Sequence, residues 1–222
     1  MRLNRIHPDP GVTSPEQATS GLRLGDLAPE DRPYVVLNMV MSADGRASIG
    51  GRSGPIGDEA DRELFHGLRT QVDAVLVGAG TVRTEGYGRL VKDAGQRARR
   101  EREGFAADPL AVIASRSGNA GIPDQEFVII EADSARLGAL RTERGIRSIL
   151  CEGGPTLNAS LLAQGLVDEI FLSLAPKIAG GGEVPGIVTG PGLPEPAKLE
   201  LLHVLEREGN LFLRYRLNHR DS

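Results

Sequence analysis

The sequence predicts an α/β fold with a largely parallel sheet that becomes mixed toward the C-terminus. Short apolar runs of strand length alternate along the chain with segments of helical spacing, which is typical of parallel α/β proteins. The last part of the chain instead contains two extended runs joined by a turn, which indicates an antiparallel hairpin. With 222 residues, 40% of them hydrophobic, the chain is long enough to bury the core of one domain.

The stretch before the first apolar run is rich in proline, glycine, serine and aspartate and has no apolar periodicity. Prolines exclude a continuous helix across it, and they stand at Pro8, Pro10, Pro15, Pro29 and Pro33. We therefore expect residues 1–32 to form an arm or tail that lies on a neighbouring surface. Residues 33–218 are expected to form the folded domain.

The predicted strands are short apolar runs, too short and too rich in valine and isoleucine to favour helices. They cover residues 34–40, 73–78, 110–114, 127–130, 148–153 and 169–176. Between them, residues 58–69 are expected to form a surface helix capped by Asp58, on which His66 is interpreted as a polar face residue. Residues 155–166 begin with a proline at a helix-entry position and predict a second helix. Residues 199–217 predict the hairpin.

Composition excludes several classes of protein. The single cysteine, Cys151, cannot pair within the chain, which indicates a reducing compartment and argues against a cysteine-based zinc site. The net charge of −4 with dispersed basic residues argues against a nucleic-acid partner. Because no long apolar run and no secretory signal are found, we expect a cytoplasmic protein with no membrane contact. The alternating charges of residues 96–104 indicate a solvated helix or loop.

Two glycine-rich turns each follow a predicted buried strand. The first contains Gly78 and Gly80, and the second contains Gly153 and Gly154 just before the helix over residues 155–166. Glycine lets main-chain N–H groups approach an anion, and a helix N-terminus adds the positive end of its dipole. Either turn alone is equally typical of a tight connection, and neither matches the GxGxxG pattern. Both, however, are expected at the carboxyl edge of the sheet, where a pyrophosphate would bind.

A third polar cluster, NMVMSADGR (residues 38–46), follows the first strand of the domain. Its Asp-Gly pair is typical of a plain turn. The functional alternative is that Asn38, Ser42 and Asp44 line the same edge of the sheet as the glycine turns.

Four blocks of sequence resemble the riboflavin-pathway pyrimidine reductases, which comprise the reductase half of the bifunctional RibD/RibG enzymes and their stand-alone relatives. The blocks are NMVMSADGR, RELFHGLR, VGAGTVRTEGYGRL and CEGGPTLNASLLAQGLVDEIFLSLAPKIAGGG. The resemblance implies a three-layer fold like that of dihydrofolate reductase, with helices on both faces of a mixed, mostly parallel sheet. It implies NADPH-dependent reduction of the ribosyl group of an amino- or diamino-ribosylaminopyrimidine 5′-phosphate to the ribityl form.

The resemblance also implies which residues form the site. Cofactor contacts are expected at Asn38, Met41, Ser42, Pro55, Gly78, Ala79, Gly80, Thr81, Val82, Glu85, Ser115, Gly153, Gly154, Pro155, Thr156 and Leu157. Substrate contacts are expected at Ser53, Arg69, Leu90 and Glu152, with no metal.

Roles follow for three of these residues. The planar fork of Arg69 suits a phosphate, although a solvated charge at a helix end is the alternative. The reaction needs a proton as well as the cofactor, and Glu152 and Asp44 are the candidate acids. For Glu152, a structural carboxylate bonded to main-chain N–H groups is the alternative.

The chain departs from the family pattern at several positions. Asn38 stands where bifunctional bacterial enzymes commonly have lysine, and Glu85-Gly86-Tyr87 replaces an Asp-Asp-Pro sequence. Pro55 stands where some members have tryptophan. One cysteine cannot build the zinc deaminase that accompanies the reductase in bifunctional enzymes, so a stand-alone reductase is expected.

The sequence is compatible with more than one substrate. The pyrimidine is either the 5-amino or the 2,5-diamino form. A pterin or dihydrofolate reductase and a non-catalytic NADPH-binding module are the rival hypotheses. The glycines of residues 177–183 fit either a flexible lid or a bulged strand exit. A homodimer is expected from the family and from the apolar C-terminal strands.

Overall fold

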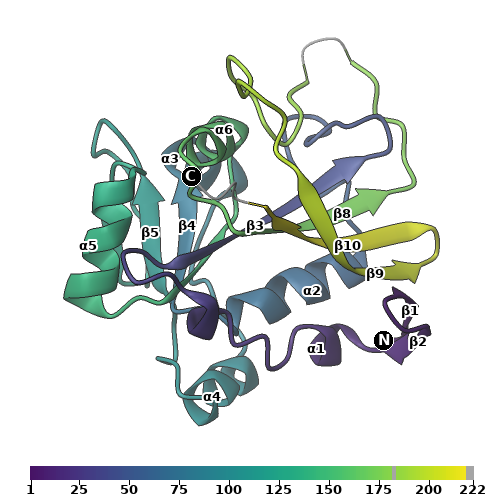
Figure 1. Ribbon diagram of the computed structural model, residues 1–222, viewed down its shortest axis with the longest axis horizontal. Helices are drawn as coiled ribbons and strands as arrows, with labels where there is room; N and C mark the ends of the chain where they lie inside the picture. Colours follow the sequence, from purple (N-terminus) through teal and green to yellow (C-terminus); the bar gives the residue numbers. More distant parts are fainter. Residues whose placement is uncertain (182–183, 219–222) are drawn as a thin grey trace.

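The computed structural model describes residues 1–181 and 184–218 and builds them around one ten-stranded sheet (Figure 1). The strands are β1 (Leu3–His7), β2 (Gly11–Thr13), β3 (Tyr34–Ser42), β4 (Ala74–Gly78), β5 (Leu110–Ala114), β6 (Phe127–Ile130), β7 (Ser148–Cys151), β8 (Glu169–Ala175), β9 (Leu199–Arg207) and β10 (Asn210–Leu217). The helices are α1 (Pro15–Ala18), the 3₁₀ helix η1 (Leu24–Leu27), α2 (Glu59–Arg69), α3 (Ala79–Glu85), α4 (Ala94–Arg102), α5 (Ser134–Arg144) and α6 (Pro155–Ala163).

The strand order is β2-β1-β9-β10-β8-β3-β7-β4-β5-β6. From β8 to β6 every neighbouring pair is parallel, whereas β10, β9, β1 and β2 are antiparallel to their neighbours. This confirms the predicted mixed sheet, and β9 and β10 form the predicted C-terminal hairpin. Each predicted strand is found within a few residues of its expected bounds, because a strand buried on both faces carries an uninterrupted apolar run.

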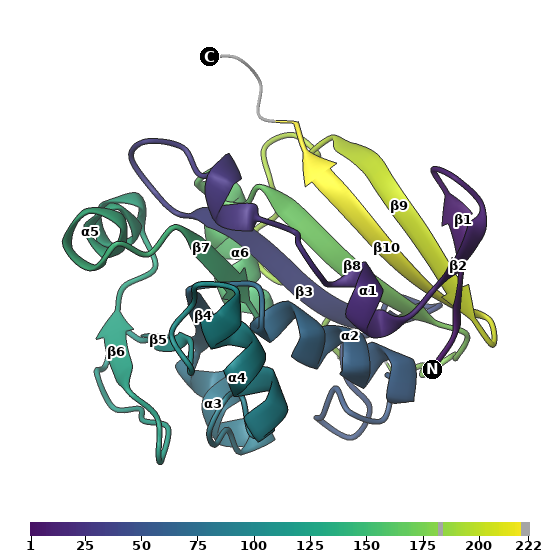
Figure 2. The same cartoon turned by 90° about the horizontal axis from the view of Figure 1, so that it is seen from below.

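The core has one layer on each face of the sheet. Val35 and Leu37 of β3 point toward α5 and α6, in a cluster with Leu137 and Leu161 of those helices. Val36 points to the other face, where a second cluster includes side chains from α2, α3 and η1. Figures 1 and 2 accordingly show α2 and α6 on opposite sides of the sheet. The helices on both faces confirm the three-layer arrangement.

The first 32 residues, expected to form an arm or tail on a neighbouring surface, extend the edge of the sheet. β1 pairs with β9 and so extends the sheet, and Leu3 is fully buried in a cluster with Leu205 and Phe212. The physical reason is that β9 would otherwise present an unpaired edge, which β1 covers. A five-residue strand with a single buried side chain leaves no apolar pattern in the sequence.

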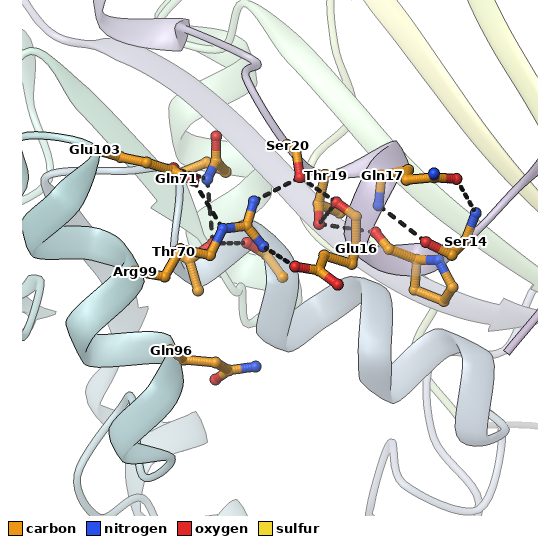
Figure 3. Close-up of polar contacts among 12 residues, drawn as sticks. Ser14, Glu16, Gln17, Thr19, Ser20, Thr70, Gln71, Gln96, Arg99 and Glu103 are labelled. Atoms are coloured by element: carbon orange, nitrogen blue, oxygen red, sulfur yellow. Dashed lines mark hydrogen bonds and ion pairs between the residues drawn. The ribbon is translucent and has the colours of Figure 1, made fainter.

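A polar clasp joins this N-terminal segment to α4 and to the end of α2 (Figure 3). The guanidinium of Arg99 donates to the Ser20 hydroxyl at 2.6 Å and lies 3.6 Å from the Glu16 carboxylate. It also donates to Glu103 at 2.8 Å, and Glu103 accepts a second hydrogen bond from Gln71 at 2.7 Å. The N-terminal segment therefore braces the same helix, α2, whose opposite face borders the cavity described below.

Residues 96–104 are only partly the solvated segment that their charges suggest. Arg100 of α4 is fully buried and donates from Nη1 to the main-chain carbonyls of Arg69 and Val72, and from Nε to that of Ala106. It thereby satisfies carbonyl groups that the end of α2 leaves unpaired. Within the described residues, no helix is long and apolar enough to cross a membrane.

Candidate active site

A cavity of about 1250 Å³ opens at the carboxyl edge of the parallel strands. Its wall includes residues at the ends of three strands or directly after them, namely Gly78 after β4, Ser115 after β5 and Glu152 after β7. In open α/β sheets ligands bind at this edge, outside the carboxyl ends of the strands. The cavity has two halves, which are named here after the ligands expected from the sequence. The cofactor half lies around the glycine turns, and the substrate half lies between α2 and the loop of residues 47–54.

The two glycine turns lie side by side. The N–H of Gly78 donates to the carbonyl oxygen of Gly153 at 2.8 Å, and a Cβ atom at Gly154 would lie 2.8 Å from the Thr81 hydroxyl oxygen. Gly153 has a φ of +87°, which favours glycine, and the Gly153–Gly154 peptide bond is cis. A side chain at Gly153 or Gly154 would therefore disturb the approach of one turn to the other.

Helix α6 begins in this half of the cavity without a side-chain cap. Gly154 is its N-cap residue and Pro155 its first residue, and among the described residues no side chain accepts a hydrogen bond from the first turn. The first-turn N–H groups and the positive end of the helix dipole are therefore available to an anion. A dinucleotide pyrophosphate fits these donors and the glycine turns, which leave room for it.

Most of the predicted cofactor residues line the cavity, and a few do not. The lining residues are Asn38, Gly78, Ala79, Gly80, Thr81, Glu85, Ser115, Gly154, Pro155, Thr156 and Leu157. Met41, Ser42, Pro55, Val82 and Gly153 lie outside the lining. Val82 belongs to the core on the α2 side of the sheet, and the Gly153 carbonyl is used by the neighbouring turn. The sequence does not reveal these contacts of Val82 and Gly153, so it does not predict that the two residues lie outside the lining.

Two arginines that the sequence analysis does not predict stand at the far end of the cofactor half. Arg83 of α3 and Arg116 after β5 are exposed and line the cavity together with Ser115 and Ser117. Glu131 lines the wall nearby, directly after β6. This end therefore offers two guanidinium groups and two hydroxyl groups to a ligand.

A buried ion pair between Arg69 and Glu152 borders the substrate half, where Glu152 lines the cavity. Arg69 donates from Nε and Nη2 to the two carboxylate oxygens of Glu152 at 2.6 and 2.7 Å, and from Nη1 to the Leu90 carbonyl at 2.7 Å. The Tyr87 hydroxyl donates to Glu152 Oε2 at 2.6 Å. Burial alone would lower the pKa of Arg69, but the Glu152 carboxylate outweighs it and the pKa lies above its ordinary value. Burial and Glu152 also raise the pKa of Tyr87 well above its usual range.

Arg69 and Leu90, two of the expected substrate contacts, bond to each other in the structure. Arg69 directs all three of its donor nitrogens to protein atoms and does not line the cavity. Leu90 contributes its main-chain carbonyl to Arg69 rather than a surface to the cavity. Glu152 lines the cavity and is one partner of a buried ion pair with Arg69.

Asp44, the other candidate acid, is held by three hydrogen bonds. It accepts hydrogen bonds from the Ser42 hydroxyl at 2.6 Å and from the N–H groups of Ala179 and Gly180 at 3.0 and 2.8 Å. These bonds, that from Ser42 first, hold its pKa well below the usual range, so it stays ionised. It lies outside the cavity lining and anchors the turn that begins at Lys177, of which residues 182 and 183 lie outside the described chain.

The substrate half also contains a face of α2 that is not predicted from the sequence. Asp61, Arg62, Phe65 and His66 all line the cavity, spaced at helical intervals that place them on one side of the helix. This helical spacing is the feature of the sequence from which the cavity-facing side of α2 could have been predicted. Across the cavity, the N–H and hydroxyl of Ser53 both donate to Glu85 at 3.0 Å, so these two predicted residues are brought together.

Comparison with known proteins agrees with this geometry. The family model of the RibD C-terminal domain matches residues 33–213. A 2,5-diamino-6-ribosylamino-4(3H)-pyrimidinone 5′-phosphate reductase of Archaeoglobus fulgidus is 29% identical over 213 residues, which cover 82% of this chain and 96% of that protein. Its namesake from Methanothermobacter thermautotrophicus is 32% identical, over 77% of this chain and 91% of its own length.

Among solved structures, a pyrimidine reductase-like protein from Corynebacterium diphtheriae superposes with a TM-score of 0.78 at 23% identity. The match covers 93% of this chain and 100% of that one, which shows a common fold over almost the whole length. The sequence match and the shared architecture agree with the resemblance drawn from the four sequence blocks. The chain therefore belongs to the RibD C-terminal domain family.

Proposed function

We propose that this protein reduces the ribosyl group of 2,5-diamino-6-ribosylamino-4(3H)-pyrimidinone 5′-phosphate to the ribityl group, with NADPH as the reductant. The observation that carries the proposal is one cavity that joins two glycine turns and an uncapped helix N-terminus to a polar wall of α2. The reduced nicotinamide supplies the hydride when it is bound, and the protein supplies position and charge. The similar stand-alone proteins bear this substrate in their names and match over nearly their whole length, which favours the diamino form.

The choice of NADPH over NADH rests on the adenosine end of the cavity. Arg83 and Arg116, with the Ser115 hydroxyl, are suited to a 2′-phosphate, because guanidinium groups make strong charge-assisted hydrogen bonds to phosphate oxygens. Replacing both arginines with alanine should weaken NADPH binding by about 10–100-fold, taking about 1.5–3 kcal/mol for hydrogen bonds to charged groups. NADH binding should change little. Equal losses for both cofactors would contradict this assignment.

The 5′-phosphate of the substrate is assigned to Arg62 and His66. They lie one turn apart on α2, both are exposed to the cavity, and within the described part of the chain Arg62 has no ion-pair partner. An Arg62→Ala substitution should raise KM for the phosphorylated substrate by about 10–100-fold. It should leave the dephosphorylated nucleoside unaffected. Glu63→Gln, an exposed change on the same helix, is the matched control.

The deciding experiment follows NADPH absorbance with the pyrimidine phosphate and with dihydrofolate in parallel. Dihydrofolate is a real second candidate because Arg69 is already engaged by Glu152, which removes one cation from the expected phosphate site. Oxidation with the pyrimidine alone supports the proposed function, and oxidation with dihydrofolate alone supports the rival. Binding of NADPH without oxidation by either would indicate a non-catalytic module.

A homodimer is the proposed assembly. Leu211 and Leu213 of β10 lie opposite Leu174 and Leu172 of β8, and all four side chains are only half-buried in the single chain. Pairing of two copies through this sheet face would complete their burial, and an isologous contact is the commonest way for one chain to do so. Light scattering after size-exclusion chromatography measures the mass directly. A monomer at micromolar concentration would contradict the assignment.

A further inference from the structure

Three carboxyl side chains line the substrate half of the cavity, and they differ in what surrounds them. Glu152 accepts two hydrogen bonds from Arg69 and a further one from the Tyr87 hydroxyl. Glu85 is exposed and accepts two hydrogen bonds from Ser53. The third, Asp61, is only partly exposed, and the Ser173 hydroxyl of β8 acts on its carboxyl group. Of the three, Asp61 is the carboxyl group whose surroundings favour retaining a proton.

The position of Asp61 is defined by three parts of the fold. It is the third residue of α2, and one turn later Phe65 lines the same cavity wall. A Cβ atom at Gly57 would lie 2.2 Å from Asp61 Oδ2, so the carboxyl group occupies space that only a glycine leaves. Ser173 is on β8, where its register partner is Val40 of β3, another residue of the cavity wall. The carboxyl group is thus held at the wall, between the helix and the sheet.

We propose that Asp61 is a catalytic acid that donates its proton to the ribose ring oxygen. This inference rests on the proposed function. As the C1′–O4′ bond breaks, O4′ takes the Asp61 proton, and the lone pair of the exocyclic nitrogen forms the C1′=N bond of the open-chain iminium. C1′ then becomes the carbon to be reduced, and the Asp61 carboxylate regains a proton from water. The net reaction consumes one proton, which ends on O4′.

The charges around Asp61 agree with this role. Burial raises its pKa, and the Asp58 carboxylate acts in the same direction. The Ser173 hydroxyl and the positive charges of Arg62 and Lys177 act against the rise. The Lys177 ammonium group donates to the carbonyl oxygens of Pro55 and Ile56, at 2.9 and 2.8 Å. The protonated carboxyl group therefore persists to higher pH than that of an exposed aspartate.

The first test uses Asp61→Asn, with Glu63→Gln as the matched control on the exposed face of α2. A lost general acid should lower kcat with the pyrimidine phosphate by about 10²–10⁴-fold with little change in KM, whereas the control should keep wild-type rates. A second readout needs no cofactor. Opening and reclosing of the ribose ring interconverts the two anomers at C1′, which NMR of the C1′ proton follows. The wild type should accelerate this exchange above the rate in buffer, and Asp61→Asn should not.

The second test uses Ser173→Ala and does not depend on whether Asp61→Asn folds. Asp61 must be protonated to act, so kcat should fall as pH rises through its pKa. Removing the Ser173 hydroxyl raises that pKa, and the falling limb of the kcat–pH profile should move to higher pH. A purely structural role for Asp61 would leave the limb in place.

Two results would overturn the inference while the proposed function stands. They are an active wild type with an equally active Asp61→Asn variant, and an unmoved pH limb in Ser173→Ala. A wild type that neither oxidises NADPH with this substrate nor exchanges its anomers would overturn the proposed function, and this inference with it.

Discussion

Replacing Arg69 with methionine would remove the cation from a buried ion pair and leave its volume largely filled. The side chains of Arg69 and Glu152 are only 9% and 2% exposed, and two hydrogen bonds join them at 2.6 and 2.7 Å. The variant leaves a carboxylate in the protein interior with the Tyr87 hydroxyl as its remaining donor. Burying an unpaired charge in this way is among the most destabilising single changes.

The expected magnitude can be reached by two routes. Two unit charges about 4 Å apart attract by about 4 kcal/mol at an effective dielectric constant of about 20. Breaking a buried pair by removing one partner costs about 3–5 kcal/mol in proteins. For a chain of this size, each kcal/mol lowers Tm by about 2–4 °C, so the variant should melt about 6–20 °C below the wild type.

Urea and thermal unfolding, followed by circular dichroism, measure this loss, and two further variants identify its cause. Arg23→Met breaks an ion pair whose side chains are 81% and 45% exposed, and it should cost less than about 1 kcal/mol. Adding Glu152→Gln to Arg69→Met removes the stranded charge and should restore part of the lost free energy of unfolding. A cost for Arg69→Met no larger than that for Arg23→Met would refute the reasoning, because burial would then not matter.

Three further predictions concern Gly154, Gly67 and Cys151. Gly154→Ala would place a methyl group 2.8 Å from the Thr81 hydroxyl oxygen, so Kd for NADPH in a fluorescence titration should rise at least about tenfold, or about 1.4 kcal/mol; an unchanged Kd would exclude this turn from the cofactor site. Gly67→Ala would place Cβ 2.3 Å from the Thr19 hydroxyl oxygen, and urea unfolding should show a loss of about 1–3 kcal/mol from overpacking between α2 and the N-terminal segment. Burial raises the pKa of Cys151 to about 12, so Ellman's reagent at pH 8 should label the thiol only after unfolding.

The parts of the fold that the sequence predicts are those where one physical signal dominates. The buried parallel strands carry apolar runs, and α2 has both its Asp58 cap and an apolar stripe. Helices α3 and α5 are not predicted. Helix α3 begins directly after Gly78, where the sequence predicts a turn that contains Gly78 and Gly80. Helix α5 has few apolar side chains to mark its buried face, although Asp133 caps it.

The roles of single side chains are harder to predict, because they depend on partners distant in sequence. Arg69 is separated from Glu152 by 83 residues, and Asp44 from the N–H of Ala179 by 135. Nothing local to Arg69 distinguishes a phosphate ligand from the cation of a buried pair. The position of the glycine turns is easier to predict, because glycine itself indicates a close approach of the main chain.

The replacement of a family proline by Tyr87 has a consequence for how the site can hold its substrate. An ionised carboxylate offers about four acceptor positions. Glu152 uses two for Arg69 and one for the Tyr87 hydroxyl, so about one remains toward the cavity that it lines. A proline at position 87 would supply no hydroxyl and would leave two positions for ligand hydroxyl groups. In this chain Glu152 therefore has about one acceptor position left for a ligand in the cavity, whose wall also includes Asp61 and Arg62 of α2.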